Sequence, residues 1–204
     1  MPSQREIRRR IASVRNIKQI TRAMQFVAAS KLKRAQDATL ASRPYSDKID
    51  EVLADVASVL GEQEHPLLAQ REGTRRCIVV FTTDRPLAGA LNANVVRFVG
   101  REILEHRGDI AIVAVGRKGR DALRRMRVPI AASFANYGDR PSFADVLPLA
   151  RLITDDYLTG TYDRVELVYA EFISTLTQRP RMDALLPIHP SADTRGIPGN
   201  QFIF

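Results

Sequence analysis

The sequence predicts an α/β fold, in which a Rossmann-like parallel sheet domain follows a long N-terminal coiled-coil helix. Two observations carry this prediction. From residue 77 onward, nearly continuous runs of valine and isoleucine alternate with segments of helical spacing, which is typical of a parallel sheet covered by helices on both faces. Ahead of them, residues 3–41 contain no glycine or proline and carry apolar residues at steps of three and four.

The alternation assigns the elements in order. Strands are predicted at residues 77–82, 110–115, 128–132 and 165–172, and helices at residues 92–107, 118–126 and 143–158. A glycine and a proline within residues 61–66 end the preceding helical pattern. We therefore expect a helix over residues 1–65, a linker over residues 66–75 and the sheet domain over residues 76–204.

The apolar seam of the first helix has the period of a left-handed coiled coil. Its steps average about 3.5 residues rather than 3.6, and its members are Ile7, Ile11, Val14, Ile17, Thr21, Met24, Ala28, Leu32 and Ala35. Roughly 39 residues at 1.5 Å each make a rod of roughly 58 Å. The alternative is an ordinary amphipathic helix that covers a sheet. Such a helix does not need this length. Pro44 predicts a kink or a new helix start, after which the apolar pattern resumes through Leu60.

Apolar side chains also occur away from the seam. Ile20 and Val27 fall on one flank and Phe26 on the opposite side, whereas a lone surface helix keeps a single apolar stripe. The pattern therefore predicts that more than one partner surrounds the middle of the helix.

The excess positive charge of the chain lies on the same helix. Residues 1–36 hold ten lysines and arginines and one acidic residue, whereas the other 168 residues hold 21 basic and 22 acidic ones. The net charge of +8 therefore belongs to one element, and we expect that element to face an acidic partner.

Composition sets the broad class. The chain has 204 residues, of which 45% are hydrophobic and 26% charged, as in a globular protein with a substantial core. It contains no apolar run of about 18 residues, which a membrane-spanning helix needs, and its first residues form no apolar signal core. We therefore expect a cytoplasmic protein. The single cysteine, Cys77, opens an apolar run and is expected to be a buried, unreactive thiol.

Signals for catalysis or cofactor binding are weak. The loop over residues 82–90 has one glycine where a dinucleotide-binding turn needs three. Gly116-Arg117-Lys118-Gly119-Arg120 follows a strand and opens a helix, so it is the best candidate for binding a small anion, although an ordinary solvated turn has the same pattern. The three histidines, His65, His106 and His189, are far apart in the sequence. We predict no enzyme, no metal site and no cofactor.

At this point several motifs carry a resemblance. The segments IRRRIASVRNIKQITRAMQFVAASKLKRAQ (7–36), ASRPY (41–45), TTDRPLAGALN (82–92), FISTLTQRPRMDALLPI (172–188) and, weakly, QFIF (201–204) resemble the gamma subunit of F-type ATP synthases. The resemblance spans essentially the whole chain, and its first motif is highly specific.

The resemblance implies a rotor shaft. In that family the N- and C-terminal helices form a coiled coil inside a ring of alpha and beta subunits, and the α/β domain forms a foot beside the epsilon subunit and the membrane rotor ring of c subunits. The implied location is peripheral, on the cytoplasmic face of a bacterial cell membrane. The residues that would contact the alpha/beta ring are Arg9, Lys18, Ile20, Arg22, Phe26, Val27, Lys31 and Arg85, and those that would contact the rotor ring are Phe202 and Phe204.

The chain departs from the family pattern in two places. Pro86, Ala88 and Ala90 stand where the family's loop commonly has two glycines and a cysteine, which affects any contact that needs those backbone angles or that thiol. The sequence also stops at Phe204, so the family's long C-terminal helix is expected to be missing.

Two other classes of function remain as alternatives. A nucleic-acid-binding protein would lay the basic helix along phosphates, but it would need a polar or basic exposed face where this helix has Ile20, Phe26 and Val27. A Rossmann-type enzyme would need a cofactor signature.

Overall fold

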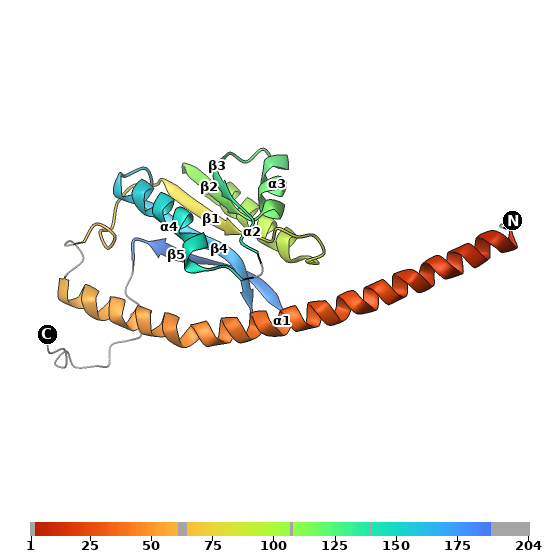
Figure 1. The fold of residues 1–204 in the computed structure, drawn as a ribbon. Helices are drawn as coiled ribbons and strands as arrows, with labels where there is room; N and C mark the ends of the chain where they lie inside the picture. The colour runs from red at the N-terminus through yellow and green to blue at the C-terminus, as the bar shows by residue number, and fades with distance from the viewer. Residues whose placement is uncertain (1–2, 61–64, 107, 139, 189–204) are drawn as a thin grey trace. The chain divides into compact units, whose positions relative to one another are not determined.

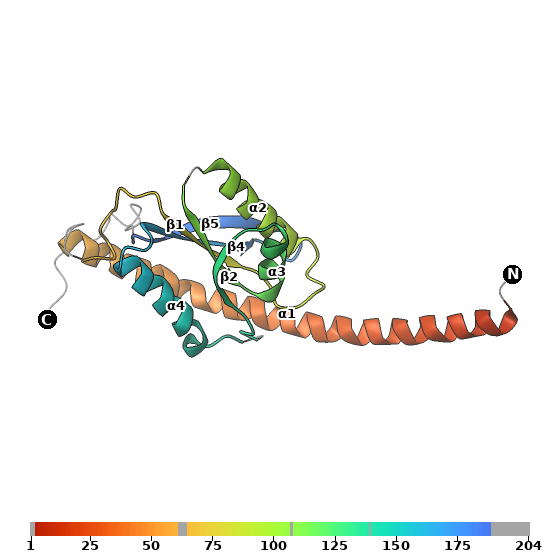
Figure 2. The same cartoon turned by 90° about the horizontal axis from the view of Figure 1, so that it is seen from above.

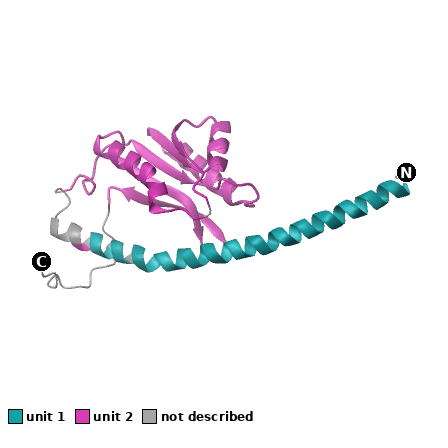
Figure 3. Cartoon of the chain, in the orientation of Figure 1, with its two compact units in different colours: residues 1–53 teal, residues 54–204 magenta. Residues whose placement is uncertain are grey.

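The computed structural model describes residues 3–60, 65–106, 108–138 and 140–188. The chain divides into two compact units, residues 1–53 and residues 54–204 (Figure 3). The first unit is built from most of a single long helix, α1 (Gln4–Leu60). The second contains a five-stranded sheet with helices on both faces (Figure 1). We refer to residues 65–188 as the sheet domain.

Helix α1 begins with a reciprocal cap. The backbone N–H of Ser3 donates to Glu6 Oε2 at 3.0 Å, and the N–H of Glu6 donates to Ser3 Oγ at 3.4 Å, so two donors that the first turn leaves free are satisfied. The helix then runs to Leu60 with Pro44 inside it. Of the two outcomes predicted at Pro44, a kink or a new helix start, the new helix start is therefore wrong. A proline removes one hydrogen bond, and the helix-forming residues on both sides keep the remaining turns intact.

The sheet contains β1 (Arg76–Phe81), β2 (Ile110–Val115), β3 (Ile130–Phe134), β4 (Arg164–Phe172) and β5 (Gln178–Leu186), in the spatial order β3-β2-β1-β4-β5. The four strands β1 to β4 are parallel, as predicted. Strand β5, which the sequence analysis did not predict, pairs antiparallel with β4 from Gln178 to Leu186, with a register shift between Val165 and Glu166. The sheet is therefore mixed at one edge.

Strand β3 lies two residues later than expected. Val128 does not belong to the strand because its N–H donates to Leu123 O at 3.1 Å, and Arg127 adopts a positive φ of 61°. Both residues thus complete the end of the helix before them. The predicted strand over residues 128–132 is corrected to Ile130–Phe134.

Helices α2 (Leu91–Glu105) and α3 (Arg117–Arg125) cover one face of the sheet, and α4 (Phe143–Leu158) covers the other (Figure 2). Successive residues of β1 alternate between the two cores: Cys77 and Val79 pack on the α4 side, Ile78 and Val80 on the α2 side. Because both faces are buried, the strand is apolar from Cys77 to Phe81. Cys77 is fully buried, and loss of hydration raises the pKa of its thiol to about 12, as expected of an unreactive core residue.

Candidate functional site

The predicted seam of α1 is exposed within its unit. Its larger apolar side chains are between 45% and 63% accessible, and these are Ile7, Ile11, Val14, Ile17, Met24 and Leu32. The small seam residues Thr21, Ala28 and Ala35 are exposed as well. Thr21 Oγ1 donates to the carbonyl of Ile17 at 2.8 Å, so this hydroxyl is satisfied within the helix and leaves the seam largely apolar.

Apolar exposure continues on other sides of the helix. Phe26 is 68% accessible, and Ile20 and Val27 are 60% and 57% accessible. Exposed apolar residues gathered on one element are typical of a surface that contacts another molecule, and their spread over several sides is the feature that the sequence pattern predicted.

The basic residues share this surface. Arg9, Lys18 and Arg22 are exposed, whereas Lys31 is half-buried and takes part in an interaction. Near the amino end, Arg8 and Arg15 border a shallow groove with Ile11 between them. Charge and apolar area thus occur side by side, an arrangement that suits a partner with acidic residues around an apolar contact.

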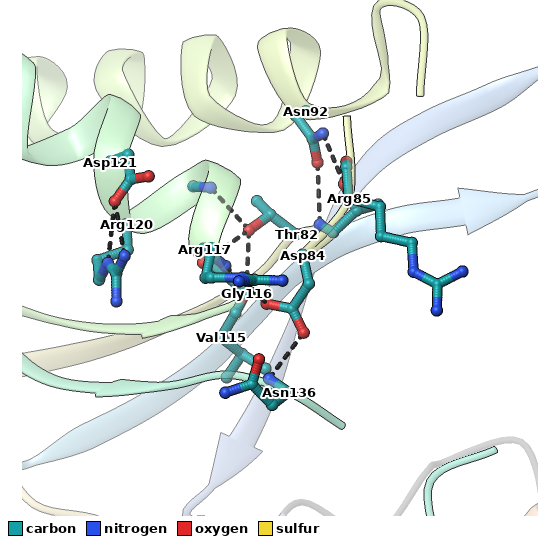
Figure 4. Close-up of polar contacts among 12 residues, drawn as sticks. Thr82, Asp84, Arg85, Asn92, Val115, Gly116, Arg117, Arg120, Asp121 and Asn136 are labelled. Atoms are coloured by element: carbon teal, nitrogen blue, oxygen red, sulfur yellow. Dashed lines mark hydrogen bonds and ion pairs between the residues drawn. The ribbon is translucent and has the colours of Figure 1, made fainter. Parts of the chain in front are cut away.

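A second candidate surface is the loop between β1 and α2, which contains Arg85. Figure 4 shows Asp84 at the centre of its contacts. Asp84 Oδ1 accepts the N–H of Arg117 at 3.0 Å, and its Oδ2 accepts the N–H of Asn136 at 2.7 Å. One carboxylate therefore joins the three loops that leave the carboxyl ends of β1, β2 and β3.

The other end of the same loop is held by an amide. Asn92 Oδ1 accepts the N–H of Thr83 at 3.0 Å, and Asn92 Nδ2 donates to Thr83 Oγ1 at 2.8 Å. Between these fixed ends the loop turns outward: Leu87 has a φ of 67° and is 90% accessible. The side chain of Arg85 points away from the contacts of Asp84 (Figure 4).

The hydrogen bonds of this region also show whether residues 116–120 have free N–H groups that could bind an anion. The N–H of Gly119 donates to Thr82 Oγ1 at 2.9 Å and the N–H of Lys118 donates to Thr83 O at 3.1 Å, while Arg117 N–H is bonded to Asp84. A phosphate binds a helix start through free N–H groups, and here all three are engaged by protein atoms. The structure therefore does not support an anion site at this turn.

A crevice at the carboxyl ends of β1 and β4 lies where the direction of the strand order reverses, which is the usual ligand position in open α/β sheets. Its volume is about 370 Å³. The described residues that line it include Gly89, Leu91, Asn94, Ala170 and Leu176, and none of the lining residues is charged. The lining therefore lacks a group that would pair with a pyrophosphate.

The remaining candidates lie apart. His65 Nδ1 accepts the N–H of Leu67, and His106 lies beside Glu102 on α2. His189, Phe202 and Phe204 fall outside the described residues. Among the described residues, no cluster of three or more histidine, cysteine or acidic side chains could hold a metal ion. No helix in the described part of the chain is both long and apolar enough to span a membrane.

The sequence did not identify Asp84, Asn92 and the exposed Leu87 as parts of one candidate surface. The motif over residues 82–92 marked the loop, but the partners of Asp84 lie 33 and 52 residues further along the chain. Only the parallel arrangement of β1, β2 and β3 brings these backbone donors together.

Comparisons with known proteins agree with the motifs. The profile of the family described as ATP synthase matches residues 3–204. An ATP synthase gamma chain from Dehalococcoides mccartyi is 47% identical over 192 residues, which cover 93% of this chain and 67% of the relative. One from Desulforamulus reducens is 43% identical over all of this chain and 72% of its own length.

A solved structure matches as well. A chain of the central stalk and c-ring of the mitochondrial ATP synthase from Tetrahymena thermophila superposes with a TM-score of 0.65 and 26% identity, covering 82% of this chain and 72% of that chain. The resemblance that the sequence motifs predicted is confirmed: the chain belongs to the family of ATP synthase gamma chains.

Proposed function

We propose that this chain is the central rotor shaft subunit of an F-type ATP synthase. It couples rotation of the proton-driven membrane ring to ATP synthesis or hydrolysis in the alpha/beta ring, and it contributes no catalytic side chain of its own. The observation that carries the proposal is the surface of α1, where an apolar seam, off-seam apolar residues and a strong positive charge coincide on one helix. Membership of the gamma chain family and the likeness to a central stalk support it.

The form of α1 suits a mechanical part. The helix is uninterrupted over 57 residues, or about 85 Å at 1.5 Å per residue. A shaft transmits torque through stiffness, and the hydrogen-bonded turns on both sides of Pro44 supply it. The role requires no general base, metal or cofactor from this chain.

The surfaces of α1 then have separate roles. The seam packs against a partner helix, and Ile20, Phe26 and Val27 pack against the surrounding alpha and beta subunits. The basic residues Arg9, Lys18, Arg22 and Lys31, with Arg85 on the sheet domain, face acidic loops of the ring. The functional division is the one predicted above: a shaft over residues 1–65, a linker over residues 66–75 and a foot over residues 76–204.

The other partners and the location rest on the family resemblance. The foot would contact the epsilon subunit and the c-subunit ring, with Phe202 and Phe204 toward the ring. The chain would lie on the cytoplasmic face of the bacterial cell membrane and would be attached to it through the complex alone. No observation favours the nucleic-acid alternative, because exposed Phe26 and Val27 interrupt the face that phosphates would occupy.

The test is co-assembly with ATP synthase alpha and beta subunits, followed by an ATPase assay. The wild-type chain should co-purify with both subunits. Phe26→Ser should weaken assembly, whereas Leu104→Ser, which alters an even more exposed side chain on α2 of the sheet domain, should weaken it less. If the chain fails to bind alpha and beta subunits but binds duplex DNA with a strong salt dependence, the nucleic-acid alternative replaces this proposal.

The basic residues give a graded test. Single replacement of Arg9, Lys18 or Arg22 by alanine should cost on the order of 1 kcal/mol or less each, because the contacts are partly solvated. The loss should be largest at low salt. A single replacement that abolishes assembly at every ionic strength would contradict this assignment of the charges.

A further inference from the structure

The segment that enters the sheet domain, residues 65–75, is fastened along its length. It was predicted as a linker, and it has no helix or strand of its own after the short turn at residues 65–68. Its first fixed point is Leu67, whose carbonyl accepts the N–H of Ile188 at 2.8 Å. The segment therefore joins the end of β5 before it reaches β1.

The second fixed point is Arg71. Its Nη1 donates to the carbonyl of Tyr157 at 2.6 Å and to that of Tyr162 at 3.2 Å, and its guanidinium lies 4.4 Å from the centre of the Tyr157 ring. Tyr157 is fully buried, and its hydroxyl donates back to the carbonyl of Ala69 at 2.9 Å. Arg71 thus binds the carboxyl end of α4, and Tyr157 of α4 binds the segment in return. A cation at this end also complements the helix dipole.

The third fixed point is Asp163, which precedes β4 and is 3% accessible. Its carboxylate accepts the N–H of Arg75 at 3.0 Å and is paired with the Arg75 guanidinium, with Nη2 at 2.9 Å from Oδ1. Gly73 lies against this carboxylate so closely that a Cβ there would be 2.0 Å from Oδ2. Any side chain at position 73 would have to displace Asp163.

We propose that residues 67–75 form a rigid clamp that fixes the entering chain to the carboxyl end of α4 and the start of β4. Arg71 and Asp163 are its positioning residues. Because the clamp leaves the segment no free length relative to the sheet, force that arrives from the N-terminal side enters the sheet domain at the end of β5, at α4 and at β4. The clamp itself is independent of the proposed function, whereas its role in transmitting torque rests on it.

Amide hydrogen exchange on the whole chain tests the clamp. The amides of Arg75 and Ile188 should be protected in the wild type. In Arg71→Ala and in Gly73→Ala they should exchange at least tenfold faster, while the amides of Ile78 and Val113 inside the sheet keep their protection. Arg151→Ala, at an exposed position on the same helix α4, is the matched control and should change neither set.

Arg71→Lys provides the milder variant if alanine unfolds the domain. A lysine keeps the charge but cannot bond two carbonyls with a planar fork over the tyrosine ring, so it should open the clamp partially. The clamp is refuted if the amides of Arg75 and Ile188 exchange in the wild type as fast as unprotected amides. It is also refuted if none of the variants accelerates the exchange of these two amides.

The role in torque is tested in complexes with alpha and beta subunits that carry a probe on the foot. The angular variance of the probe during pauses between ATP-driven steps should rise at least twofold in Arg71→Ala and stay unchanged in Arg151→Ala. An opened clamp with unchanged variance would overturn the torque role. A wild-type chain that forms no rotating complex would refute the proposed function, and amide exchange would still decide the clamp.

Discussion

Asp84 should stabilise the sheet domain more than a partly exposed carboxylate normally does. Its two oxygens hold the N–H groups of Arg117 and Asn136, from segments that follow two different strands. Each hydrogen bond to a charged group is worth about 1.5–3 kcal/mol when buried. The Asp84 side chain is 19% accessible, so water can partly replace its hydrogen bonds when it is removed. We therefore expect Asp84→Ala to lower the free energy of unfolding by about 2–4 kcal/mol in total.

The assay is thermal unfolding followed by tyrosine fluorescence, because four of the five tyrosines lie in the sheet domain and only Tyr45 lies on α1. For a chain of this size, the loss corresponds to a fall in Tm of roughly 5–15 °C. Asp84→Asn should lose about half as much, since an amide offers one acceptor oxygen instead of two.

The control is Asp155→Ala, which removes an exposed carboxylate from α4 and should change the free energy of unfolding by no more than about 0.5 kcal/mol. If Asp84→Ala has as small an effect as this control, the sheet and the other contacts of the loops hold the three loop ends, and the argument that Asp84 fixes them is wrong.

Three further predictions concern the sheet domain. Gly116→Ala should destabilise it by more than about 2 kcal/mol, because φ is +96° and a Cβ would lie 2.2 Å from a backbone oxygen; Gly138→Ala, also at positive φ but with open space around it, should cost about 1 kcal/mol in chemical denaturation. Cys77 should resist alkylation at pH 8 in the folded chain and react once denaturant exposes it, since burial raises its pKa to about 12; rapid labelling of folded protein would contradict its burial. The hydrogen bond from Arg75 lowers the pKa of Asp163 below its ordinary value of 3.8. The contribution of Asp163 to the stability of the folded domain is therefore complete above pH 3.8 and is lost as the pH falls through the lowered pKa. Asp163→Asn should flatten the acid side of the curve of stability against pH. An unchanged acid side would refute this.

The sequence predicted the buried elements well because their signals are local. The strand over residues 110–115 and the helix over residues 143–158 match β2 and α4 at both ends. A buried parallel strand is an unbroken apolar run, and α4 begins with Ser142 and Asp145, which cap each other. The residues that define these elements lie within the elements themselves.

Strand β5 was missed because its stability comes from its partner. Its sequence contains Pro180 and Asp183, which are unfavourable in a central strand. As an edge strand it tolerates both, and Tyr169 on β4 donates to Asp183 Oδ2 at 2.6 Å. Pairing with β4, rather than any pattern within residues 178–186, determines this strand.

The sequence predicted the surface of α1 but not the long-range contacts of the sheet domain. The seam and the charges of α1 follow from spacing, and the structure shows the large apolar seam residues and Arg9, Lys18 and Arg22 exposed. The contacts of Asp84 and the clamp through Arg71 join residues from 33 to 91 positions apart. Such contacts depend on the order of strands in the sheet, which no local pattern encodes.

The central claim is that this chain turns inside an alpha/beta ring. Because Cys77 is buried, Leu104→Cys would place a single reactive thiol on the sheet domain for a rotation probe. We predict that complexes of this variant with alpha and beta subunits show stepwise, unidirectional rotation of the probe when ATP is added, and that Phe26→Ser reduces the fraction that rotates. Complexes that hydrolyse ATP with full affinity for the chain while the probe stays still would contradict the rotor shaft assignment.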